Sequence, residues 1–166
     1  ILAGDIVSGI DKMEKSMSVL VCTENVYIKQ HIREAMLTVF DSLALIFRLL
    51  NESKEERKVC MPLLHKIFKY GYEHLKELGC ANRKAYGEKA HFAFIEVLYK
   101  IGVELLDYYE KKDPDLAKTY YYQTLYTLGE DRLKDPDLSP EDKCAVEQRM
   151  SVLETLIGDI ENGADC

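Results

Sequence analysis

The sequence contains no apolar run long enough to cross a membrane. Its densest run, LALIFRLL at residues 43–50, falls short of the roughly 18 apolar residues that a membrane-spanning helix needs. Hydrophobic residues make up 47% of the 166 positions and charged residues 31%, which argues against a disordered or collagen-like chain. We therefore predict a soluble protein with no membrane partner, folded as a single domain over residues 1–166.

Concentrated positive charge is also missing. No lysine-rich or arginine-rich stripe occurs anywhere in the chain, so we expect no nucleic-acid partner. The net charge is −7, and residues 130–166 account for the excess because they hold eleven acidic and only four basic residues. This acidic end is either a well-solvated helix face or a docking surface for a basic partner.

The cysteines form no C-x-x-C pair and no framework spacing. They are odd in number and widely separated, at Cys22, Cys60, Cys80, Cys144 and Cys166. This usage favours a reducing compartment and predicts a cytoplasmic protein. Because the first residue is Ile1 rather than Met, we expect a fragment or a processed chain, and a secreted chain that has lost its signal peptide is the alternative.

Short catalytic signatures are absent as well. The sequence has no G-x-S-x-G, no P-loop and no dinucleotide-binding fingerprint. Glu88 and His91 have the Glu-x-x-His spacing of di-iron helical bundles, but no second pair of this kind occurs. We therefore expect no cofactor and a protein that is not an enzyme. A metal-assisted helical enzyme centred on Glu88 and His91 is one alternative.

Strand-type alternation is missing too, and apolar residues recur with the helical period along most of the chain. The spacing predicts helices over residues 5–21, 24–50, 53–79, 82–111, 114–133 and 140–162. We predict an all-α fold with about six helices, arranged as an antiparallel bundle or as stacked helical hairpins.

Two helix starts carry the same local chemistry. Asp113 precedes Pro114, and Ser139 precedes Pro140. In each pair the first residue is a preferred N-cap, and proline at the first helical position lacks an amide that would have no partner there. We expect the fifth and sixth helices to begin at these two prolines.

Earlier boundaries have their own signals. Residues 53–56 form an S-x-x-E capping box, and Asn82 is a candidate N-cap for the fourth helix. Between them, Pro62 predicts a kink or a fresh helix start near residues 60–62 because it lacks a backbone amide.

The tetrapeptide DPDL occurs twice, at residues 113–116 and 135–138. The residues that follow the two copies share no apolar register, and their spacing of 22 residues is short of the ~34 of a tetratricopeptide unit. The two copies therefore mark boundaries between helices, and they are not corresponding positions of a structural repeat. The stretch LYKIGVELLDYYEKKDPD at residues 98–115 is nevertheless similar to the second helix of a tetratricopeptide unit, and this resemblance implies stacked helical hairpins.

Tyrosine is the most concentrated residue type. Six of the eleven tyrosines fall within 19 residues around the first DPDL. The period of 3.6 residues predicts a buried face in the fifth helix, made of Ala117, Tyr121, Leu125 and Leu128. On that geometry Tyr122 and Tyr126 form a small aromatic pair at the boundary of the core or in solvent.

Tyrosine offers a large contact area with a hydrogen-bonding tip, so we predict partner contacts at Tyr109, Tyr122 and Tyr126. The plain alternative is that these rings line the edge of a bundle with their hydroxyls in water. The leading hypothesis is a non-enzymatic helical protein–protein interaction or regulatory module. Its partner would be a protein, a peptide or a second copy of the chain.

A helical ligand-binding domain is the remaining alternative. It predicts an enclosed pocket inside the bundle, lined by Phe94, Leu98 and Tyr121.

Overall fold

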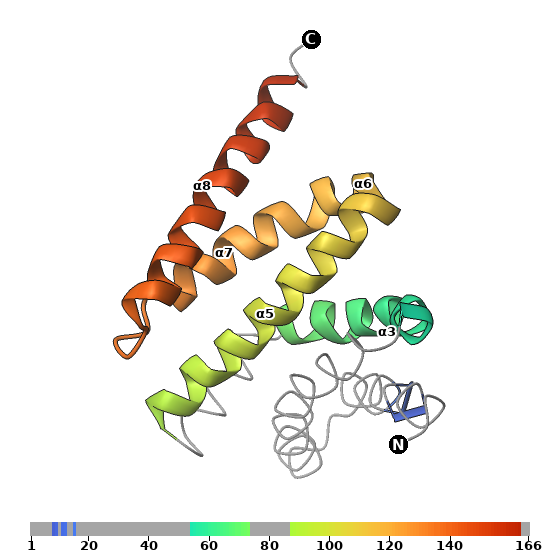
Figure 1. The fold of residues 1–166 in the computed structure, drawn as a ribbon, viewed down its shortest axis with the longest axis horizontal. Coiled ribbons are helices and arrows are strands. Elements are labelled where there is room, and N and C mark those ends of the chain that lie inside the picture. The colour runs from blue at the N-terminus through green and yellow to red at the C-terminus, as the bar shows by residue number, and fades with distance from the viewer. Residues whose placement is uncertain (1–7, 10, 13–14, 16–53, 74–86, 164–166) are drawn as a thin grey trace. The chain divides into compact units, whose positions relative to one another are not determined.

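The computed structural model describes residues 8–9, 11–12, 15, 54–73 and 87–163, and every regular element among them is a helix (Figure 1). The elements are α3 (Lys54–Glu73), α5 (Glu88–Lys112), α6 (Pro114–Leu116), the π-helical turn η1 (Ala117–Tyr121), α7 (Tyr122–Arg132) and α8 (Pro140–Gly163). Because α6, η1 and α7 follow one another without a break, these residues form four helical segments. The prediction of an all-α fold is confirmed for this part of the chain.

The predicted helices over residues 5–21 and 24–50 lie outside the described residues, except at positions 8–9, 11–12 and 15, which are helical. The count of about six helices therefore stays a prediction. Among the helices that are described, none is long and apolar enough to cross a membrane.

The chain divides into two units, residues 1–101 and 102–166, and the division falls within α5. The single domain, and the choice between a bundle and stacked hairpins, stay predictions.

In the first unit, α3 is one helix that runs through Pro62. The proline ring is exposed, while Leu64, Ile67 and Gly71 are buried as the helical spacing predicts. A fresh helix start near Pro62, one of the two predicted possibilities, is therefore wrong. One missing amide is tolerated here because the neighbouring turns keep their apolar face buried.

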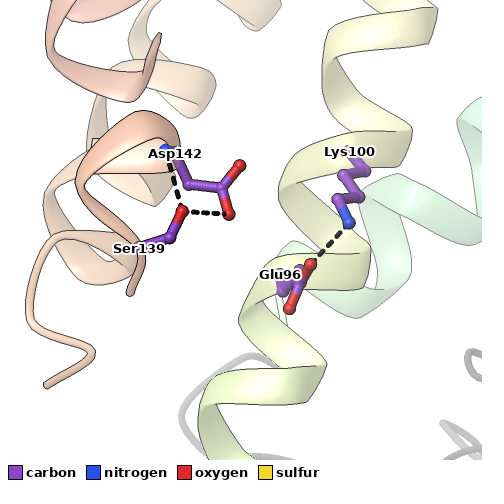
Figure 2. Close-up of polar contacts among 4 residues, drawn as sticks. All are labelled: Glu96, Lys100, Ser139 and Asp142. Carbon is purple, nitrogen blue, oxygen red and sulfur yellow. Dashed lines mark hydrogen bonds and ion pairs between the residues drawn. The ribbon is translucent and has the colours of Figure 1, made fainter. Parts of the chain in front are cut away.

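The helix α5 begins at Glu88, later than the predicted start at Asn82, which lies outside the described residues. Gly87 has a φ of 87°, a value that a right-handed helix does not allow, and its carbonyl accepts a hydrogen bond from the amide of His91 at 3.4 Å. On the solvent side of α5, Glu96 and Lys100 form an ion pair one turn apart (Figure 2). Both side chains are exposed, so this pair contributes little to stability.

In the second unit, the predicted start at Asp113 and Pro114 is confirmed. The carboxylate of Asp113 accepts a hydrogen bond from the amide of Leu116 at 3.1 Å, and Pro114 opens α6. The helix then widens in η1, where the amide of Tyr122 donates to the carbonyl of Ala117, five residues back. The predicted face of Ala117, Tyr121, Leu125 and Leu128 is fully buried.

The second DPDL lies in the connection between α7 and α8, as predicted, and α8 begins at Pro140. Figure 2 shows the cap: the hydroxyl of Ser139 accepts a hydrogen bond from the amide of Asp142 at 3.1 Å and donates to its carboxylate at 3.0 Å. Ser139 is thus an N-cap, and the carboxylate of Asp142 orients its hydroxyl. It offsets the lack of helical partners for the first amides of α8.

The helices α7 and α8 pack closely at Gly129. A Cβ atom on this glycine would lie 2.8 Å from both Cγ and Sδ of Met150 and 3.6 Å from Cγ1 of Val146. Absence of a side chain at Gly129 therefore lets α8 approach α7. From this end the two helices diverge along the chain direction of α8 (Figure 1).

Replacing Ser139 by alanine removes the cap of α8 and is expected to lower the free energy of unfolding by about 1 kcal/mol. Urea denaturation followed by circular dichroism measures this change. Ser151 is exposed in the middle of α8, so Ser151→Ala is the matched control and should leave stability unchanged or slightly raised. Equal stabilities of Ser139→Ala and the unaltered chain would show that the cap is not needed.

Candidate functional site

Four tyrosines, Tyr108, Tyr109, Tyr120 and Tyr121, form a cluster where the end of α5 meets η1. The rings of Tyr109 and Tyr121 are stacked, with centroids 5.6 Å apart and planes 17° from parallel. Tyr108 meets Tyr109 edge-on at 5.0 Å, and Tyr120 meets Tyr121 edge-on at 5.2 Å. Both geometries are favourable for aromatic rings, so this tyrosine cluster fastens α5 to the helix that follows it.

Tyr122 does not lie where the sequence predicts. Its side chain is only 7% exposed, and its hydroxyl donates a hydrogen bond to a carboxylate oxygen of Glu110 at 3.4 Å. The prediction of a boundary or solvent position for Tyr122 is therefore wrong. The reason is the π turn: because five residues instead of four separate the bonded groups, Tyr121 and Tyr122 both turn toward the buried side.

The three predicted partner-contact residues therefore differ in their surroundings. Tyr109 and Tyr122 are buried, and Tyr126 is half-buried. Two of the three rings are thus already buried. Their role in partner binding stays a prediction, and the structure gives only Tyr126 a partly accessible ring.

Burial also sets the ionisation of these phenols. Burial raises the pKa of Tyr121 strongly, and the neighbouring Tyr109 and Tyr120 raise it further. The pKa of Tyr109 is raised first by burial, then by Tyr108 and then by the carboxylate of Asp113. The pKa of Tyr122 is raised first by burial and then by Glu110, through its charge and the hydrogen bond. All three hydroxyls are therefore neutral at physiological pH, which suits packing and not base catalysis.

The predicted ligand-pocket residues are all buried. Phe94 and Leu98 belong to the first unit, and Tyr121 belongs to the second. Each is placed within its own unit, so the pocket that would join them stays a prediction.

The predicted metal pair lies at the start of α5. Glu88 is exposed and His91 is half-buried. Across the described ranges, no group of three or more His, Cys, Asp or Glu side chains is gathered as a metal ion would require. The metal-assisted enzyme therefore has no support from these residues.

A different surface is exposed on α8. Within this helix only Val146 and Leu153 are buried, whereas Val152 is 59% and Ile160 40% exposed. Leu156 and Ile157, between them, are half-buried. We call Val152, Leu156, Ile157 and Ile160 the exposed α8 face. Helical spacing places Leu156 and Ile160 on the same side as the buried Leu153, yet Ile160 is exposed.

The position of α8 explains this exposure. The helix packs on α7 around Val146 and Met150, and beyond the buried Leu153 its last turns extend past the point where the two helices separate (Figure 1). Val152, Leu156 and Ile160 are spaced four residues apart and so form one row along the helix, with Ile157 beside it. Helical periodicity finds this row, but it cannot show which of its side chains stay exposed.

The charge around the exposed α8 face is negative. Glu154, Asp159 and Glu161 lie in the second half of α8, and no lysine or arginine follows Arg149 in this helix. The guanidinium of Arg149 instead faces the carboxylate of Asp107 in α5, at 3.7 Å. The second half of α8 therefore combines exposed apolar side chains with uncompensated carboxylates.

No protein-family model, no curated protein and no solved structure matches this chain. The function must therefore be argued from the residues themselves.

Tyr121→Phe tests the burial of the tyrosine cluster through pH. The pKa of Tyr121 is higher in the folded than in the unfolded chain, so its contribution to stability is complete below about pH 10, the ordinary value, and is lost as pH rises above it. One such phenol steepens the fall in stability by up to about 1.4 kcal/mol per pH unit. Between pH 9 and 11, urea denaturation should therefore show a fall in stability smaller for Tyr121→Phe by about 1.4 kcal/mol in total. Identical slopes for the two proteins would contradict the buried position of this hydroxyl.

Proposed function

We propose that the chain is a non-enzymatic helical protein-interaction module, and that its binding surface is the exposed α8 face. The observation that carries the proposal is the exposure of Val152 and Ile160, which lie in one row with Leu156. Exposed apolar residues are common singly, but a row on one side of a helix is the form in which an amphipathic helix docks into a partner's groove or against a partner's helix.

The rest of the second unit supports this surface. The close packing at Gly129 and Met150 fixes the first half of α8 on α7, and the cap at Ser139 fixes its start. The second half is then presented as a preformed helix. A preformed helix loses less conformational entropy on binding than a disordered segment, which favours association.

The size of the face suits a transient partner. Full burial of one Val, Leu or Ile side chain gains about 1.5–3 kcal/mol, and Leu156 and Ile157 are already half-buried. The gain from four such side chains is offset in part by the cost of association. The proposed module thus binds its partner reversibly, as a regulatory contact does, and does not form a permanent assembly.

The tyrosine cluster has a supporting role in this proposal. Its rings pack between α5 and η1, so they hold the junction from which α7 extends. Of the predicted tyrosine contacts, Tyr126 alone remains as a candidate for direct contact with a partner.

The variant Val152→Asp with Ile160→Asp tests the proposal. Helical peptides would be selected for binding to the full chain from a displayed library, and their affinities compared between proteins. We expect a loss of about tenfold or more for the double variant, because two apolar contacts are replaced by charges that must be desolvated.

Ser151→Asp with Thr155→Asp is the matched control. It adds the same charge at two exposed positions of α8 outside the row, and it should bind as the unaltered chain does. Circular dichroism checks that both variants keep their helices. Peptides that bind both variants equally well would overturn the proposal.

A further inference from the structure

The carboxylates of the second half of α8 flank the exposed α8 face on both sides. With 100° between successive residues, Asp159 falls next to Val152 on one edge. Glu154 and Glu161 fall next to Ile157 on the opposite edge. An apolar row with acidic borders is complementary to an apolar row with basic borders.

These carboxylates also lie where they weaken the helix that carries them. The C-terminal end of a helix carries a partial negative charge, so acidic groups there cost about 0.3–1 kcal/mol each at exposed sites. Asp159 and Glu161 lie near this end of α8, whose last turn has no basic residue. By contrast, the last turn of α5 contains Lys111 and Lys112, as the helix dipole favours.

An unfavourable local arrangement of this kind is expected where a binding function requires it. Cations supplied by a partner would remove the cost, because each would face a carboxylate and the negative end of the helix together. A second copy of the chain would do the opposite, since it would bring the same three carboxylates into the interface.

We propose that the occupant of the exposed α8 face is a basic amphipathic helix of another protein. Its apolar row covers Val152, Leu156 and Ile160, and its lysines or arginines lie beside Glu154, Asp159 and Glu161. An antiparallel orientation is favoured, because it places the positive N-terminal end of the partner helix near the negative end of α8. This inference rests on the proposed interaction function and adds the chemical class of the partner.

Three synthetic helical peptides with the same apolar row test the inference. Their flanking positions carry lysine in the basic peptide, glutamine in the neutral one and glutamate in the acidic one. Each is titrated into the full chain by calorimetry at low and high salt. We expect the basic peptide to bind about tenfold more tightly than the neutral one at low salt, with three ion pairs at exposed positions, and this ratio to shrink at high salt.

A variant without the three α8 carboxylates tests whether they cause the preference for the basic peptide. The triple variant Glu154→Gln, Asp159→Asn and Glu161→Gln should bind the basic and the neutral peptide equally, and it should fold well because it relieves the unfavourable end of α8. The matched control neutralises three exposed carboxylates elsewhere in the second unit, as Glu130→Gln, Glu141→Gln and Glu147→Gln. The control should keep most of the preference for the basic peptide.

The possible failures are distinguishable. A neutral peptide that binds as tightly as the basic one overturns the inference and leaves the proposed function standing. Binding of none of the three peptides overturns both. A dimer of the chain in sedimentation experiments that is lost in Ile160→Asp would also overturn the inference, because a second copy would then occupy the face.

Discussion

The close approach of α7 and α8 at Gly129 is the contact on which the arrangement of the second unit depends. Met150 occupies the space that a side chain on Gly129 would fill, at 2.8 Å from the position of its Cβ. Because this contact lies near the middle of α8 and the helices diverge beyond it, Val146 and Leu153 are buried, whereas Ile160 is exposed (Figure 1). The exposed α8 face is thus a consequence of where two helices touch, and its acidic borders give that face a preference among partners.

The π turn has a comparable effect at the other end of the same helical segment. By placing five residues between bonded groups it turns both Tyr121 and Tyr122 inward, where one stacks on Tyr109 and the other bonds Glu110. A regular α-helix would bury one of these rings and expose the other. The concentration of tyrosines therefore serves packing between α5 and η1, and the proposed binding surface lies on α8 instead.

Local features of the structure could be predicted from the sequence, and features that depend on tertiary packing could not. The starts at Asp113 and Ser139 were predictable because a cap and its amides lie within one turn. The buried rows of α3 and α7 follow from periodicity alone. The π turn changes that period by one residue without a sequence signal, so the position of Tyr122 was missed. Exposure of Ile160 depends on the direction in which α8 leaves α7, which no spacing within α8 encodes.

The central claim is that the second half of α8 is a preformed helix on which Val152 and Ile160 are exposed, and that a basic helix of another protein covers this face. Amide hydrogen exchange along α8 in the full chain tests this claim most directly, because exchange reports local opening. The account predicts slow exchange for residues 144–153, faster exchange for residues 156–163, and slowing of only the latter on addition of the basic peptide. Uniformly slow exchange along α8 in the free chain, with no change on peptide addition, would contradict it.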